Sequence, residues 1–319
     1  PLPQGQTAAL PALVDAWIVQ RSVTALVVLK DGRIVHESYH QGTRPEDLRM
    51  SWSVAKSFLS ALLGIVMAEG AIESLDDPVT KHAPELIGTA YDGASIRNVL
   101  NMASGVAFNE DYMDFKSDIN KMGRVLALGG SLDDFATSVR TRAWPPGKHW
   151  HYVSIDTHVL GMVIRGATGR GIPDLLSEKI FAPLGLEATP HYLTDGTGQP
   201  FVLGGLNLTT RDYARFGQLY LQNGKARDRQ IVPAEWVTAS TLASAPTEPG
   251  AIGYGYQWWV PQAAPPGEFM ARGVYGQFIY VNRPAGVVIA VNSADRGFTE
   301  DGVEAQNIAR LRSIAKSLG

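Results

Sequence analysis

The chain has 319 residues, of which 45% are hydrophobic and 18% charged, and its formal net charge is −3 at pH 7. This size and composition allow a large buried core, as in one large globular domain or two closely packed ones. The near-neutral charge, without runs of one sign, argues against nucleic acid and acidic membrane surfaces as partners. No apolar stretch reaches the roughly 18 residues of a membrane span. The absence of cysteine excludes disulfides, thiolate metal sites and a cysteine nucleophile.

The N-terminal part of the chain predicts a helix, a hairpin and a second helix. Apolar spacing indicates a short amphipathic helix over residues 10–19, and the apolar run over 23–29 predicts a buried strand. Asp31-Gly32 is typical of a tight turn into an alternating strand over 34–39. A proline-free apolar helix follows over 58–67.

From about residue 72 to 203 the sequence has few strand patterns and frequent proline and glycine. Helices are expected in this part and just after it over residues 95–102, 119–128, 131–139, 155–167, 172–181, 209–222 and 233–242. Strand patterns return at residues 254–260, 268–271, 277–282 and 287–292, before a final helix over 303–318.

Strands at both ends of the chain with helices between them predict an α+β fold. An antiparallel sheet would form from N- and C-terminal segments, flanked by helices, with an inserted all-α lobe. The expected domains are a sheet domain of residues 1–71 and 204–319 and a helical domain of residues 72–203, with the active site in the cleft between them.

The clearest candidates for catalytic residues are Ser53 and Lys56, which lie at the N-terminal end of the helix over 58–67. Their spacing puts the two side chains one turn apart on one helix face. Burial there would lower the pKa of the lysine, because desolvation disfavours the ammonium ion, and a neutral lysine can take the proton of a serine hydroxyl. The first turn of a helix also points backbone N–H groups at an anion formed on the serine. This pattern predicts a nucleophilic serine.

The same spacing occurs again at Ser313 and Lys316, inside the amphipathic C-terminal helix. So short a pattern arises by chance in a chain of this length, and a solvated helix face explains the second copy. The prediction for Ser53 therefore depends on the residues that accompany it.

Tyr152 is the expected partner of this pair. It lies between a Pro-Pro-Gly turn at 145–147 and the helix over 155–167, on a loop that a rigid scaffold can direct into a cleft. A nearby lysine cation would hold the phenol partly ionised, which makes Tyr152 a candidate base toward the serine and acid toward the leaving group. Tyr280, in a similar local pattern, lies in the middle of a strand and is better explained by sheet packing.

The segment from Ala271 to Gln277 enters a C-terminal strand and contains two glycines. Glycine there allows a substrate to approach the backbone closely. The backbone N–H groups of Val274 and Ser53 are the expected oxyanion hole.

Together these motifs resemble the serine hydrolases of the class C β-lactamase and penicillin-binding superfamily, whose three motifs are Ser-x-x-Lys, Tyr-x-Asn and Lys-Thr-Gly. The resemblance covers nearly the whole chain, through the Asp31-Gly32 hairpin, the Ser53 motif, the final glycine-bearing strand, and residues 96–105, 204–212 and 254–259. It implies a β-lactamase/transpeptidase-like fold and acylation of Ser53, with Lys56 and Tyr152 handling protons.

The chain departs from the lactamase pattern at two places. Ser154 stands where lactamases have asparagine, and Arg272-Gly273 stands where they have Lys-Thr-Gly. The missing lysine and threonine surround the β-lactam carboxylate in that family, and arginine differs from lysine in shape and reach. At these two places the chain resembles β-lactamase-like carboxylesterases and 6-aminohexanoate-oligomer (nylon oligomer) hydrolases instead. Likeness to the latter over residues 109–114 implies that Tyr112 hydrogen-bonds the scissile amide nitrogen, although chemistry alone explains Tyr112 equally well as an ordinary loop aromatic.

The residues expected to contact substrate are Tyr112, Ser154, Gly273, Trp258 and Tyr275. Trp258 and Trp259 alternate on the predicted strand over 254–260, so one is expected in the core and the other on the cleft wall.

The sequence thus predicts a serine hydrolase that forms an acyl-enzyme from a small-molecule ester or unstrained amide. A β-lactamase or D-alanyl-D-alanine carboxypeptidase would use the same residues, and a penicillin-binding sensor domain would acylate without turnover; both stay open. No cofactor or metal is expected, because His149 and His151 lack a third ligand at suitable spacing.

The sequence does not determine the cellular compartment or the oligomeric state of the protein. The chain begins at Pro1 rather than Met, which suggests that an upstream segment was processed or omitted. Bacterial cytoplasm, periplasm and secretion are all compatible with it, as are a monomer and a homodimer.

Overall fold

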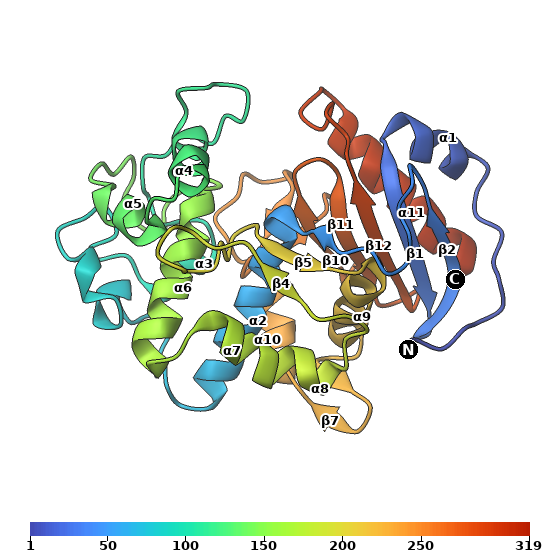
Figure 1. The fold of residues 1–319 in the computed structure, drawn as a ribbon, viewed down its shortest axis with the longest axis horizontal. Coiled ribbons are helices and arrows are strands. Elements are labelled where there is room, and N and C mark those ends of the chain that lie inside the picture. The colour runs from blue at the N-terminus through green and yellow to red at the C-terminus, as the bar shows by residue number, and fades with distance from the viewer.

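The computed structural model describes residues 1–319 and contains a seven-stranded antiparallel sheet in the order β2-β1-β12-β11-β10-β9-β8 (Figure 1). The strands come from the two ends of the chain: β1 (Val23–Lys30), β2 (Arg33–Tyr39), β8 (Gly253–Tyr254), β9 (Trp259–Val260), β10 (Glu268–Gly273), β11 (Gln277–Asn282) and β12 (Val287–Ser293). N-terminal β1 pairs along its length with C-terminal β12, with Val27 opposite Ala290. The predicted α+β fold is confirmed.

The turn between β1 and β2 is the predicted tight hairpin. Asp31 has φ 48° and Gly32 has φ 76°. Two consecutive residues at positive φ match the twist of the flanking strands, and Asp-Gly tolerates this conformation.

Both faces of the sheet are covered by helices. One face packs on α9 (Thr210–Leu221), and the other packs on α1 (Leu13–Gln20) and α11 (Val303–Leu318) (Figure 1). Strand β1 shows why: Val27 and Leu29 join the core on the α9 side, whereas Leu26 and Val28 join the core on the α1 and α11 side. Side chains alternate along a strand, so a continuous apolar run is buried on both faces.

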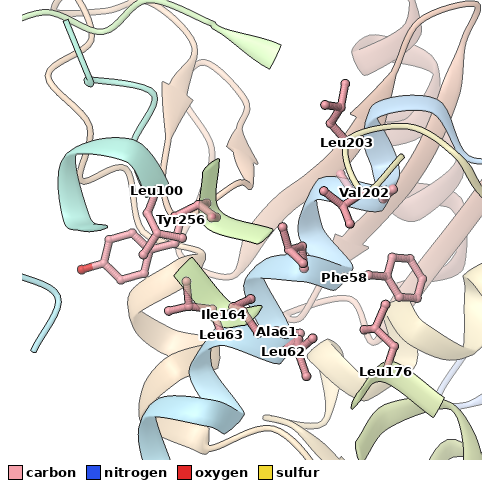
Figure 2. Packing of buried hydrophobic residues seen from close by; sticks show 14 of the residues in the cluster. Phe58, Ala61, Leu62, Leu63, Leu100, Ile164, Leu176, Val202, Leu203 and Tyr256 are labelled. Atoms are coloured by element: carbon pink, nitrogen blue, oxygen red, sulfur yellow. The ribbon is translucent and has the colours of Figure 1, made fainter. Parts of the chain in front are cut away.

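The remaining helices form the other half of the molecule: α2 (Ala55–Ala68), α3 (Ile96–Leu100), α4 (Asp118–Ala127), α5 (Leu132–Ser138), α6 (Ser154–Thr168), α7 (Ile172–Leu176), α8 (Ala182–Leu184) and α10 (Ala234–Ser240). Figure 2 shows Phe58, Leu62 and Leu63 of α2 among apolar side chains that include Leu100 of α3 and Ile164 of α6. A helix that is apolar on nearly all sides is stable only when it is surrounded. Helix α2 is therefore a fixed support for the residues at its N-terminus.

Two small sheets complete the structure. One has the order β3-β5-β4, and the other pairs β6 with β7. Their strands are β3 (Arg49–Met50), β4 (His191–Tyr192), β5 (Leu206–Leu208), β6 (Lys225–Ala226) and β7 (Arg229–Gln230). These strands were not predicted, because two or three residues are too short to show a period.

The prediction of one strand over residues 254–260 is wrong. The chain reverses there, so that β8 and β9 pair with each other and Gly253 lies opposite Val260. Gln257 adopts φ 65°, and a Cβ on Gly255 would lie 2.3 Å from the carbonyl oxygen of Ser240. The reversal depends on this close approach of Gly255 to the end of α10. The sequence of residues 254–260 alone does not show that contact.

The division into domains at residues 71/72 and 203/204 remains a prediction. One apolar core includes both α2, from the first predicted segment, and α6, from the second. No helix is long and apolar enough to cross a membrane.

Candidate active site

Ser53 lies in a short 3₁₀ turn, Trp52–Val54, that runs directly into α2. The sequence placed it in the first turn of the α-helix itself. Trp52 has φ 45°, an uncommon conformation for a large side chain. The tighter turn keeps Ser53 and Lys56 on one face, and Lys56 lies in the first turn of α2.

Lys56 is 2% exposed and its ammonium group lies among oxygen atoms. Nζ donates to Ser53 Oγ at 2.9 Å, to Ser154 Oγ at 3.2 Å and to the carbonyl oxygen of Leu203 at 3.3 Å. Burial lowers the pKa of Lys56 to about 8, although the nearby carboxyl groups of Glu110 and Asp156 act in the opposite direction. A fraction of the lysine is therefore neutral near pH 7, as a base for Ser53 requires.

Asp156, the third residue of α6, is fully buried near this lysine. One carboxyl oxygen accepts hydrogen bonds from Tyr91 Oη at 2.7 Å and Ser104 Oγ at 2.9 Å. Burial raises the pKa of Asp156 to about 8, against the effect of these two donors. A largely protonated Asp156 at pH 7 opposes the neutral form of Lys56 less than a full carboxylate would.

The phenol of Tyr152 lies near the Ser53 hydroxyl, and its ring centroid lies 5.1 Å from Lys56 Nζ. The ring stacks on Trp259 with a centroid distance of 5.3 Å. Burial, reinforced by Glu110, raises the pKa of Tyr152 well above its usual 10, and the contact with Ser53 only partly offsets this. The expectation of a partly ionised phenol is therefore wrong. Desolvation of a phenolate outweighs the cations around it, so Tyr152 holds its proton.

Ser154 does not face the substrate space, contrary to the sequence prediction. It is 1% exposed, begins α6, and lies between Lys56 and Glu110. Its N–H donates to Glu110 Oε2 at 2.9 Å, and its hydroxyl donates to Glu110 Oε1. Ser154 therefore positions Lys56.

Glu110 is the residue that the sequence prediction missed. Besides Ser154, it accepts a hydrogen bond from Tyr112 Oη at 2.8 Å. It lies in the 109–114 segment noted for Tyr112, but the local sequence does not distinguish it from the neighbouring acidic residues. Its importance comes from a contact with Ser154, 44 residues away in the chain.

A cavity of about 290 Å³ opens onto these residues. It is lined by Ser53, Glu110, Tyr112, Trp150, Tyr152, Trp259, Arg272, Gly273, Val274, Gly276, Phe278, Phe298, Glu304 and Asn307. Six of these fourteen lining residues are aromatic, so the cavity can hold an apolar chain beside the reacting group.

The prediction that Trp258 contacts substrate is wrong, since it is Trp259 that lines the cavity. Trp258 is fully buried against Tyr220 and Phe269. The reversal of the chain between β8 and β9 determines which indole faces the core. Tyr275 is not among the lining residues either; it packs on Phe298, which is one of them, at a centroid distance of 4.9 Å.

Gly273 and Val274 both line the cavity. A Cβ on Gly273 would lie 3.0 Å from the backbone nitrogen of Ser53 and 2.9 Å from the carbonyl oxygen of Ser51. Only glycine lets the end of β10 lie so close to the Ser53 turn. The two backbone segments expected to form the oxyanion hole are therefore adjacent.

The family model described as Beta-lactamase matches residues 14–312. The chain belongs to the β-lactamase family. It is 30% identical over 285 residues to a 6-aminohexanoate-dimer hydrolase of Paenarthrobacter ureafaciens, which covers 84% of this chain and 72% of that protein. A D-aminopeptidase of Brucella anthropi is 28% identical over 171 residues, covering 51% of this chain and 31% of that protein.

Among solved structures, a putative 6-aminohexanoate-dimer hydrolase from Bacillus anthracis superposes with a TM-score of 0.87 at 24% identity, covering 99% of this chain and 88% of that one. This likeness establishes the fold. The predicted family is confirmed, and the chain is a β-lactamase-fold hydrolase related to 6-aminohexanoate-dimer hydrolase and D-aminopeptidase.

Proposed function

We propose that this protein is a serine hydrolase that cleaves an ester or an unstrained amide through an acyl-enzyme on Ser53. The observation that carries the proposal is the 2.9 Å contact between Ser53 Oγ and Lys56 Nζ, a buried lysine with a lowered pKa. The relationship to 6-aminohexanoate-dimer hydrolase supports an amide or a related ester as the substrate.

In the proposed acylation step, neutral Lys56 takes the proton of Ser53 while Oγ bonds to the substrate carbonyl carbon. The oxyanion accepts hydrogen bonds from the N–H groups of Ser53 and Val274. Tyr152, a neutral phenol that lies near Ser53, passes a proton to the leaving group and is reprotonated from Lys56. Water then attacks the acyl-enzyme, and the same groups take a proton from this water and pass it to Ser53 Oγ as the acyl–oxygen bond breaks.

A substrate screen tests the proposal. We expect turnover of p-nitrophenyl esters of varied chain length or of 6-aminohexanoate dimer. Nitrocefin should be a poor substrate, because Arg272-Gly273 replaces Lys-Thr-Gly. Turnover of nitrocefin alone would overturn the proposal in favour of a β-lactamase, and one equivalent of acylation without turnover would favour a sensor domain.

The pH dependence of ester hydrolysis should follow the ionisation of Lys56. Its pKa is lowered to about 8 and the neutral form is the active base, so activity should rise about tenfold per pH unit below 8 and level off above it. Since the pKa of Tyr152 is raised, its ionisation should not reduce activity below pH 10. The measurement is kcat/KM for a p-nitrophenyl ester between pH 5 and 10. A midpoint near the pKa of free lysine would contradict the role of Lys56 as a base with a lowered pKa. The measured midpoint belongs to Lys56 and the titratable groups near it together, because their ionisations are coupled.

Tyr112 should distinguish amides from esters. An amide nitrogen must be protonated before it departs, whereas a phenolate leaves unaided. Tyr112 lines the cavity, and in the free protein its hydroxyl donates to Glu110, a bond that it would exchange for the substrate nitrogen. Tyr112→Phe should reduce kcat/KM on an amide by about 1–3 kcal/mol of transition-state stabilisation.

The control for this variant is p-nitrophenyl ester hydrolysis, which should stay within a few-fold of the parent enzyme. Equal losses on amide and ester would make Tyr112 a packing residue. Together with an absence of amide turnover by the parent, that result would favour a plain esterase.

A further inference from the structure

The cavity contains a second polar group of residues besides Ser53 and its partners. Arg272 comes from β10, and Glu304 and Asn307 come from the first two turns of α11. Residues three apart on a helix share a face, so Glu304 and Asn307 both face the cavity. The reaction proposed above uses none of these three side chains.

Arg272 and Glu304 form an ion pair with 2.5 Å between Nη1 and Oε1. Nη1 has no aligned hydrogen bond, so the contact is mainly electrostatic. The guanidinium also lies over the ring of Trp259, 4.2 Å from its centroid. The charge of Arg272 is therefore balanced by a carboxylate of the protein itself, and its plane is held against the cavity wall.

Apart from the Glu304 carboxylate, whose charge is paired with Arg272, the unused hydrogen-bonding groups here are donors. Trp17 Nε1 donates to Asn307 Oδ1 at 2.8 Å, and because an indole nitrogen only donates, this bond identifies the oxygen end of the amide. Asn307 Nδ2 is left without a protein partner, and the side chain of Arg272 has only its ion pair with Glu304 and its contact with Trp259. A substrate group that binds the Asn307 amide nitrogen and the Arg272 guanidinium must accept hydrogen bonds.

Charge decides which acceptor fits. A substrate carboxylate would place two negative groups around one guanidinium, and like charges a few ångströms apart disfavour each other strongly in a partly buried site. A neutral carbonyl oxygen accepts the same hydrogen bonds without this repulsion. Glu304 therefore acts against a free acid in this part of the cavity.

We propose that Arg272, Asn307 and Glu304 form a specificity subsite for a neutral second carbonyl in the substrate, and that Glu304 excludes a carboxylate from it. The proposal rests on the proposed function, because it concerns the substrate of the Ser53 cavity. The substrate class is an acyl compound with a further amide or ester carbonyl along its chain, as in an oligoamide.

The test uses esters that carry a terminal carboxamide or a terminal carboxylate on otherwise identical chains. The terminal group is placed on the acyl half in one pair and on the alcohol half in a second pair. In one of the two positions the parent enzyme should prefer the carboxamide at least tenfold in kcat/KM, mainly through KM. Glu304→Gln should reduce this preference at least tenfold, and Glu304→Asp, which keeps the charge, should retain it.

Asp301→Asn is the matched control, since it removes an exposed carboxylate just before α11 and outside the cavity lining. It should leave the preference unchanged. Asp301→Asn should also leave hydrolysis of p-nitrophenyl acetate, which lacks a second polar group, within about threefold of the parent enzyme. No preference in the parent enzyme at either position, or the same preference in Glu304→Gln, would overturn the proposal.

Failure of the proposed function is distinguishable from failure of this subsite. If the protein hydrolyses no ester, calorimetric binding of the same carboxamide and carboxylate compounds to the parent and to Glu304→Gln provides the same comparison. Equal affinities for the two compounds in the parent protein would then overturn the subsite by itself.

Discussion

Ser53→Ala should lower kcat/KM on a p-nitrophenyl ester by about 10⁴-fold or more, because it removes the atom that forms the acyl bond. The melting temperature should change little. Lys56 loses one of three oxygen neighbours but keeps Ser154 Oγ and the carbonyl oxygen of Leu203. Steady-state kinetics and thermal unfolding measure the two effects.

Ser313→Ala is the control for this variant. Ser313 has the same spacing to Lys316, but it lies within α11 and its hydroxyl has no hydrogen-bond partner. Its replacement should affect neither activity nor stability measurably. Intact-mass labelling with a fluorophosphonate should add one group in the parent protein and none in Ser53→Ala. An adduct on another residue would refute the assignment.

Tyr152→Phe should lower the acylation rate by about 100-fold or more, the usual contribution of a positioned acid or base. The phenol lies near Ser53 in the cavity wall, and its raised pKa keeps the proton available for the leaving group. Single-turnover measurement of p-nitrophenol release isolates this step. The rise of activity with pH should persist in the variant, because Lys56 governs it.

Tyr254→Phe is a matched control for Tyr152→Phe. Tyr254 is buried, packs edge-on against Tyr152 at 6.2 Å between centroids, and does not line the cavity. Loss of its hydroxyl should change acylation by no more than a few-fold. Near-full acylation by Tyr152→Phe would remove Tyr152 from the mechanism.

Much of the fold could be predicted because its signals are local. The Asp31-Gly32 turn, the apolar run of β1 and the apolar helix α2 each depend on residues within a few positions of one another. The predicted helices outside the 3₁₀ and π turns match the structure to within about one turn. The single strand predicted over 254–260 failed because a contact with α10 reverses the chain there.

For the candidate site, the sequence by itself determined the family and the spacing of Ser53 and Lys56, since neighbours on one helix face need no distant contact. Only the tertiary structure decided that Ser154 bonds Lys56 across 98 positions, that Trp259 rather than Trp258 lines the cavity, and that Glu304 neutralises Arg272. It also decided that Tyr152 keeps its proton. Burial and electrostatic environment belong to groups that folding brings together, and residues far apart in the chain carry no local pattern that shows them as neighbours.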